Sequence, residues 1–187
     1  KESARIIASM DFDGIAIGGV SVGETKEEMN NVLAWVSPLL PDQKPRHLLG
    51  VGEIDDIFMS IEHGMDTLDC VNPTRIARMG IVYSSDMRRQ KTEDRGQSDI
   101  ENVDQSYRLD LTKAAYADDT TPIDSECSCY TCKTVTCAYL HHLFKVRELS
   151  AYRYATIHNI HFIQSLVRTI RQSIKEGTFL ELKRRWL

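Results

Sequence analysis

The stretch Cys127-Ser128-Cys129-Tyr130-Thr131-Cys132 decides how the second half of this chain folds, because it places three thiols within six residues. His158 follows 26 residues after Cys132. Three sulfurs and one imidazole make a Cys3His set, which is typical of a closed tetrahedral zinc site. The alternatives are a disulfide or inert buried thiols, but Cys127 and Cys129 are too close for an easy disulfide. The spacing therefore predicts one structural zinc ion that ties a later helix to this turn.

Length and composition indicate a single folded domain without a membrane anchor. The chain has 187 residues, of which 42% are hydrophobic, enough for a sizeable core. It contains no apolar run of about 18 residues, so we expect no membrane span. Because it starts at Lys1, with neither a signal peptide nor an initiating methionine, we expect a fragment or a processed chain. Five cysteines, three of them clustered, favour a reducing cytoplasm and metal-bound thiols.

Charge is distributed unevenly along the chain. Residues 145–187 carry nine Lys or Arg and three Glu, a net charge of +6, so residues 1–144 must sum to −10 to give the total of −4. The basic C-terminal segment is a candidate contact for phosphates. A solvated helix face explains the same charges equally well.

Three short apolar strands alternate with helices in the first part of the chain. We expect strands at 13–19, 46–50 and 65–70, and helices at 25–36 and 54–63. This alternation predicts a parallel sheet with crossover helices, either open or closed into a barrel. In a barrel, functional residues gather at the carboxyl ends of strands, where we find Gly19, Gly50 and Asp69.

Asp69, at the carboxyl end of the third expected strand, is the candidate nucleophile or base. A loop or helix-capping carboxylate is the alternative, and Asp66 is a competing carboxylate three residues earlier. Arg75 and Arg78 follow closely and are either paired with these acids or bind phosphates and bases.

The remaining chain is predicted to contain an insertion and two helices. Residues 85–106 include ten charged residues among 22, so we expect an insertion without a role in the core. Helices are expected at 136–143 and 152–176. The second has a stripe of aliphatic residues at spacings of three and four, which predicts its core-facing side: Ile157, Ile160, Ile163, Val167, Ile170 and Ile174.

Five motifs occur in the order of one known family. They are Asp13–Gly19, Leu49-Gly50-Val51-Gly52, Asp69-Cys70-Val71-Asn72-Pro73-Thr74-Arg75, the cysteine cluster, and Ala138–Leu143. With these motifs the chain resembles the C-terminal half of a bacterial-type tRNA-guanine transglycosylase of the queuosine pathway (queuine tRNA-ribosyltransferase).

The resemblance implies an α/β fold, namely the second half of a (β/α)8 TIM barrel with an inserted Cys3His zinc subdomain. Residues 1–84 would form barrel strand–helix units with the catalytic aspartate, and 85–106 a polar insertion. Residues 107–150 would form the zinc subdomain, and 151–187 the C-terminal helix that completes the zinc site.

The resemblance also implies an activity. Enzymes of this family are pentosyltransferases that exchange guanine at the anticodon wobble position (G34) for a 7-deazaguanine, through a covalent aspartate–ribose intermediate. The implied partners are a tRNA with a GUN anticodon, the 7-deazaguanine base and, in the full-length enzyme, a second copy of the chain. Val22, where a bulky aliphatic residue is typical of bacterial members, favours pre-queuosine-1 base over queuine.

Site residues carry over position by position from this resemblance. Asp69 matches the nucleophile. The base would contact Gly19, Val20, Val22 and Leu49. The anticodon loop would contact Gly50, Val51, Gly52, Glu53, Ile54, Asp55, Asp56, Thr74, Arg75, Ile76, Ala77 and Arg78. The metal ligands would be Cys127, Cys129, Cys132 and His158. The alternative is a non-catalytic tRNA-binding piece, partner subunit or degenerate fragment that keeps only the zinc module.

Overall fold

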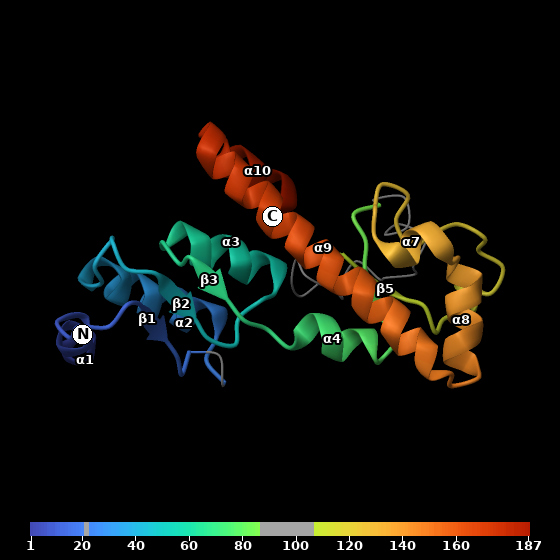
Figure 1. Cartoon of the computed structure of the whole chain (residues 1–187), viewed down its shortest axis with the longest axis horizontal. Coiled ribbons are helices and arrows are strands. Elements are labelled where there is room, and N and C mark those ends of the chain that lie inside the picture. The colour runs from blue at the N-terminus through green and yellow to red at the C-terminus, as the bar shows by residue number, and fades with distance from the viewer. Residues whose placement is uncertain (21–22, 87–106) are drawn as a thin grey trace. The chain divides into compact units, whose positions relative to one another are not determined.

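A computed structural model describes residues 1–20, 23–86 and 107–187 (Figure 1). The chain divides into two compact units, Lys1–Val71 and Asn72–Leu187. None of the helices in the described ranges is both long and apolar enough to cross a membrane. Val22 and residues 87–106 of the predicted insertion lie outside the described residues.

The first unit is a small parallel sheet with its crossover helices. Its elements are α1 (Glu2–Ala8), β1 (Ile15–Ile17), α2 (Lys26–Val36), the 3-10 turn η1 (Ser37–Leu39), β2 (Arg46–Leu48), α3 (Ile54–Glu62) and β3 (Thr67–Leu68). The strands pair in the order β1-β2-β3, all parallel. The predicted alternation of strands and helices is therefore confirmed, with shorter strands than expected. Three parallel strands among the described residues do not close a barrel, which stays a prediction.

Apolar side chains from the strands and from α2 form the core of this unit. Ile15, Ile17 and Leu48 point inward from the strands and meet Met29 and Leu33 of α2. Helix α2 begins at a capping box, in which the Thr25 hydroxyl accepts from the Glu28 N–H and the Glu28 carboxylate accepts from the Thr25 N–H. Burial of one face thus holds α2 against the sheet while the cap sets where the helix begins.

The N-terminus of α3, with its capping residue Glu53, carries three carboxylates that surround one lysine. The Lys26 ammonium lies 2.9 Å from Glu53, 2.7 Å from Asp55 and 3.5 Å from Asp56. Burial disfavours the charge on Lys26, but hydrogen bonds to Asp55 and Glu53 raise its pKa overall. Burial also raises the pKa of Asp56 to about 6, and the Lys26 charge only partly offsets this effect. These contacts join the N-termini of α2 and α3.

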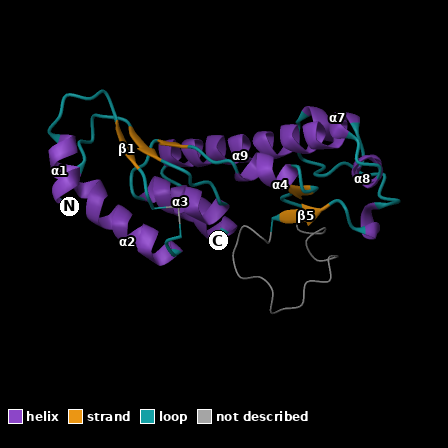
Figure 2. Ribbon diagram, turned by 90° about the horizontal axis from the view of Figure 1, so that it is seen from below, coloured by secondary structure: helices purple, strands orange, loops and turns teal. Residues whose placement is uncertain are grey.

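The second unit is mainly helical. Its elements are α4 (Asn72–Ala77), β4 (Ile81–Tyr83), β5 (Arg108–Asp110), the 3-10 turn η2 (Ala114–Tyr116), α7 (Tyr130–Thr134), α8 (Cys137–Lys145), α9 (Leu149–Glu176) and α10 (Phe179–Trp186). Strands β4 and β5 pair antiparallel. The long α9 packs against α4, α7, α8, α10 and β4, and its course beside α4 and α7 is visible in Figure 2. Both α4 and β4, which precede residue 84, pack on α9 in this unit.

The prediction of the core-facing stripe of α9 was wrong for most of its residues. Ile160, Val167 and Ile174 are 40%, 38% and 51% exposed, and only Ile170 of the stripe is fully buried. The buried face instead contains smaller and polar residues together with a few large ones: Ala151, Ala155, His158, Asn159, Phe162, Leu166, Ile170 and Ser173. Both sets have helical periodicity, and the alanines allow the neighbouring helices to approach closely.

Asn159 connects α9 to the start of the unit. Its Oδ1 accepts from the Tyr83 N–H at 3.0 Å, and its Nδ2 donates to the carbonyls of Pro73 at 3.0 Å and Ile81 at 3.1 Å. The side chain is fully buried. One amide therefore satisfies three backbone groups of α4 and β4 that water does not reach.

We expect Asn159→Leu to lower the free energy of unfolding by about 2 to 4 kcal/mol, because it leaves buried N–H and C=O groups without partners. Urea unfolding measures this loss. Gln164→Leu, on an exposed part of the same helix, is the matched control and should change stability by less than about 0.5 kcal/mol. Equal losses in the two variants would show that the amide contacts are not the cause.

The raised pKa of Asp56 predicts a dependence of stability on pH. The folded state holds this proton up to about pH 6, whereas the ordinary pKa of an aspartate is 3.8. The contribution of Asp56 to stability is therefore full below about pH 4 and is lost as pH rises through about 6. We expect Asp56→Asn to gain stability over the wild type between pH 4.5 and 8, by at most about 2 kcal/mol after solvent screening. The urea midpoints of the wild type and the variant are compared at pH 4.5 and at pH 8. A difference between the two proteins that is the same at both pH values would contradict this prediction.

Candidate functional site

The cysteine cluster and His158 converge on one point in the second unit. Their ligand atoms all lie within 4.8 Å of one another. His158 Nδ1 is 3.8 Å from Cys127 Sγ, 3.5 Å from Cys129 Sγ and 3.3 Å from Cys132 Sγ. A tetrahedral zinc ion with ordinary bond lengths separates a sulfur from a nitrogen ligand by roughly 3.5 Å. The four groups therefore fit a closed metal site, as the spacing predicted.

Neighbouring backbone groups set the orientation of the ligands. Cys129 caps α7, and its sulfur accepts from the Cys132 N–H at 3.3 Å. His158 is fully buried, and its Nε2 lies 2.7 Å from the Tyr83 carbonyl oxygen. Since a carbonyl only accepts, Nε2 carries the proton and Nδ1 presents its lone pair to the sulfurs. The Thr131 hydroxyl donates to the Tyr154 carbonyl at 2.7 Å and fixes α7 on α9.

The thiols favour a cation between them. Hydrogen bonds with Cys127 and Cys132 lower the pKa of Cys129, whereas hydrogen bonds with Cys127 and Cys129 raise the pKa of Cys132. The opposite directions have one cause, which is that one sulfur ionises by accepting hydrogen bonds from its neighbours, and these neighbours must then keep their protons. A bound divalent ion removes this competition, because thiolates are its ligands.

Asp69 lies at the carboxyl edge of the sheet in the first unit. Its side chain is 56% exposed. Oδ1 accepts from the Gly50 N–H at 3.1 Å and lies 3.2 Å from His47 Nε2. No described residue donates to Oδ2. The carboxylate is thus held through one oxygen, in a side chain that is more than half exposed.

His47 and Thr67 are neighbours of Asp69 that the sequence analysis missed. His47 Nδ1 lies 2.8 Å from Thr67 Oγ1, and the two residues are direct partners in the pairing of β2 with β3. Thr67 and Asp69 are two residues apart, so a strand places them on one face. Both residues could have been identified from the pairing of β2 with β3 together with the alternation of side chains between the two faces of a strand.

The predicted base-binding residues also lie at this edge. Gly19 has φ 77°, a conformation that favours glycine, and a Cβ there would meet nothing within 4 Å. A Cβ on Gly18 would lie 2.9 Å from Leu49 Cδ1, so the ends of β1 and β2 are in contact. Leu49 is 44% exposed, whereas Val20 is buried. Gly19, Leu49 and Asp69 therefore follow adjacent strands of one sheet.

The predicted RNA contacts differ in their environment. Glu53, Asp55 and Asp56 are engaged with Lys26, as described above, and Val51 and Ile54 are buried. A Cβ on Gly52 would lie 2.3 Å from Cys70 Cβ, so this glycine allows close packing. In the second unit, Ile76 and Ala77 are buried, while Arg75 and Arg78 are exposed. Two arginines of α4 and the turn that follows it thus remain the best candidates for RNA contact.

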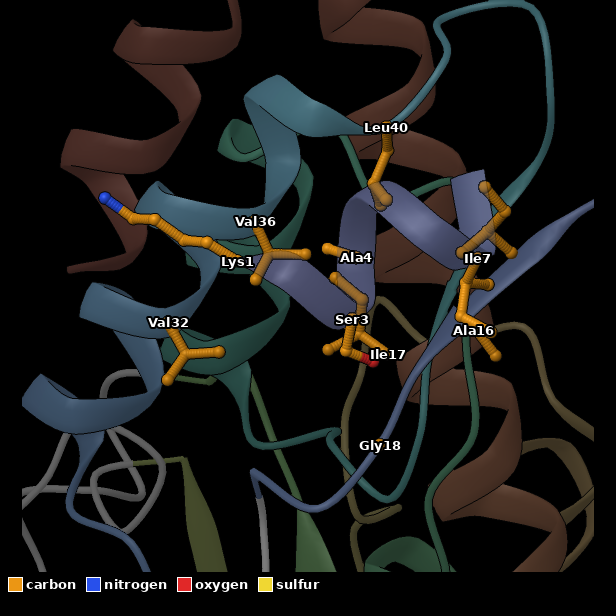
Figure 3. Close-up of a pocket in the computed structure, with 11 residues that line it drawn as sticks. Lys1, Ser3, Ala4, Ile7, Ala16, Ile17, Gly18, Val32, Val36 and Leu40 are labelled. Carbon is orange, nitrogen blue, oxygen red and sulfur yellow. The ribbon is translucent and has the colours of Figure 1, made fainter. Parts of the chain in front are cut away.

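A pocket of about 240 Å³ lies elsewhere in the first unit (Figure 3). Aliphatic side chains of α1, β1 and α2 line it, with Lys1 as the charged group among them. None of the predicted catalytic or base-binding residues lines this pocket, so we assign it no part in the chemistry.

We expect Cys129→Ser to lower the metal content well below one ion per chain and to lower the Tm by at least about 5 °C, because the metal contributes to folding. Elemental analysis and calorimetry measure the two quantities. Cys70→Ser, which alters a thiol outside the cluster, is the control and should keep the metal. Full occupancy in Cys129→Ser would contradict the assignment of this ligand.

Comparison with known proteins identifies the family. The family model for queuine tRNA-ribosyltransferase matches residues 1–187. A relative from Archaeoglobus fulgidus is 46% identical over 187 residues, which are 100% of this chain and 43% of the relative. Proteins named queuine tRNA-ribosyltransferase from Roseiflexus sp. and Streptococcus suis are 41% and 43% identical over 100% and 98% of this chain. The matched region is 42% and 43% of the length of these two relatives, so the chain spans less than half of each. The chain belongs to the queuine tRNA-ribosyltransferase family.

Proposed function

We propose that this chain supplies the nucleophile of a tRNA-guanine transglycosylase, which exchanges guanine at the anticodon wobble position for a 7-deazaguanine. The observation that carries the proposal is the Asp69 carboxylate, which is held through Oδ1 at the edge of the sheet. Its more than half-exposed side chain suits attack on a nucleotide that enters from solvent. Family membership over the whole chain supports the same reaction.

The proposed reaction consists of two displacements at the ribose C1′. Oδ2 of Asp69 forms a bond to C1′ while the bond from C1′ to guanine N9 breaks, and the electron pair leaves with the guanine, which takes up a proton. The incoming base then gives up its N9 proton and attacks C1′, and the C1′–oxygen bond electrons return to the carboxylate. Two displacements retain the configuration at C1′. Guanine must leave the anticodon stack first, at a cost of a few kcal/mol.

The base is proposed to bind against Gly19, Val20 and Leu49. The open space above Gly19 allows a base to approach its backbone, and the exposed part of Leu49 offers an apolar wall. Val22, outside the described residues, is proposed to favour pre-queuosine-1 base over queuine.

A tRNA with a GUN anticodon is the proposed macromolecular substrate. Arg75 and Arg78 are exposed guanidinium groups that suit phosphates and splayed-out bases. The segment Gly50–Asp56 is also proposed to approach the anticodon loop, although its carboxylates are partly neutralised by Lys26.

The metal is proposed to be zinc with a structural role. Three thiolates and one imidazole are a ligand set that zinc prefers, and no open position remains for a substrate. Zinc would stabilise the junction of α7, α9 and β4 and take no part in the displacements. In the full-length protein we propose a homodimer, with the zinc region as the first place to look for the interface.

Exchange of labelled guanine into tRNA tests the function. The chain is assayed alone and combined with a separately produced N-terminal segment of the Archaeoglobus fulgidus relative, which the chain does not cover. Exchange in the combined sample supports the proposal. A chain that binds metal and tRNA in this mixture without any exchange would instead be a non-catalytic module.

We expect Asp69→Asn to lower formation of the covalent RNA adduct by at least about 1,000-fold, because an amide is a poor nucleophile. Denaturing gels separate the adduct from unreacted RNA, and tRNA binding should remain. Asp66→Asn is the matched control, since Asp66 accepts from the Arg46 N–H at 2.8 Å and an amide oxygen keeps that bond. An undiminished adduct in Asp69→Asn would exclude this carboxylate as the nucleophile.

A further inference from the structure

The side chains around Asp69 form a continuous series of hydrogen bonds across two strands. Thr67 Oγ1 lies 2.8 Å from His47 Nδ1, and His47 Nε2 lies 3.2 Å from Asp69 Oδ1. The Gly50 N–H donates to the same oxygen at 3.1 Å. His47 of β2 and Gly50 of the loop after β2 thus converge on one oxygen of the carboxylate, and Thr67 of β3 contacts the other side of the His47 ring.

The chemistry of the groups sets the direction of these bonds. An ionised carboxylate only accepts hydrogen bonds, so Nε2 of His47 must carry a proton. In the neutral ring, Nδ1 is then an acceptor, and the Thr67 hydroxyl is the group that donates to it. The bonds therefore run in one direction, from Thr67 through His47 to Asp69.

We propose that His47 and Thr67 are positioning residues that orient the nucleophile, an inference that rests on the proposed function. Two donors, His47 and the Gly50 backbone, hold Oδ1 and so fix the rotation of the carboxylate. Oδ2, which accepts no hydrogen bond from the described residues, is left to meet the ribose C1′. Orientation of a reacting atom contributes strongly to rate, and small misplacements are costly.

The strand pairing supports a positioning role for this histidine. His47 is directly opposite Thr67 in the β2–β3 register, so the contact does not depend on a flexible loop. The imidazole is 33% exposed, less than the carboxylate that it contacts at 56%. The more buried group thus holds the more exposed one.

Ring-nitrogen NMR of the chain tests the direction of the bonds without any need for activity. We expect the neutral His47 ring to carry its proton on Nε2, and Thr67→Val to change its Nδ1 resonance. A ring protonated on Nδ1 would overturn the proposal, because Nε2 would then have no proton to donate to Asp69.

Kinetics of adduct formation test the consequence for the reaction, in the same combined sample as above. We expect His47→Phe to lower the rate about 10- to 100-fold, the effect of losing a hydrogen bond to a charged group. His47→Gln places an amide N–H near the position of Nε2 and should recover most of the rate. Thr67→Val should lower it by about 3- to 10-fold.

His63→Phe is the matched control. His63 also bonds through Nε2, at 2.9 Å from Asn30 Oδ1, but contacts no part of the proposed site. If the wild type forms no adduct, the proposed function fails. If the wild type forms it and His47→Phe forms it at the same rate, the positioning role alone is overturned.

Discussion

The contacts of His158 are the interaction on which the second unit depends. Nδ1 faces the three cysteine sulfurs, and Nε2–H donates to the Tyr83 carbonyl at the end of β4. The two sides of one ring thus connect the turn before α7, the long helix α9 and the small antiparallel sheet. Asn159 adds bonds from the next position of α9 to β4 and α4. A metal ion bound at the sulfurs would therefore also order the backbone that presents Arg75 and Arg78.

The first unit uses a different constraint, the register of parallel strands. Pairing of β1, β2 and β3 in chain order brings the residues that follow each strand to one edge. Gly18 contacts Leu49 there, and Gly50 donates to Asp69. Backbone with little side-chain bulk therefore lies beside the carboxylate that these contacts hold. The site is thus made by strand ends, and the 240 Å³ pocket beside α1 is separate from it.

Predictions from the sequence succeeded where they depended on residues close together in the chain. The thiol spacing, the apolar strands and the helix at 25–36 are all such local patterns. The buried face of α9 was mispredicted because two stripes share the helical period, and hydrophobicity favoured the one with isoleucines. Ala151 and Ala155 lie on the buried face because they let α9 approach its neighbours closely. His47 and Thr67 were missed because their contact with Asp69 crosses two strands.

The sequence by itself determined the four residues of the candidate metal site, the approximate positions of the strands and main helices, and the candidate nucleophile, since spacing along the chain carries that information. Tertiary structure alone decided which face of α9 is buried, which carbonyl sets the His158 tautomer, and which side chain holds Asp69. The physical reason is that these features depend on strand register and helix packing. Both depend on how much surface is buried and how many hydrogen bonds form between segments that are far apart in the chain. A local sequence pattern does not contain that information.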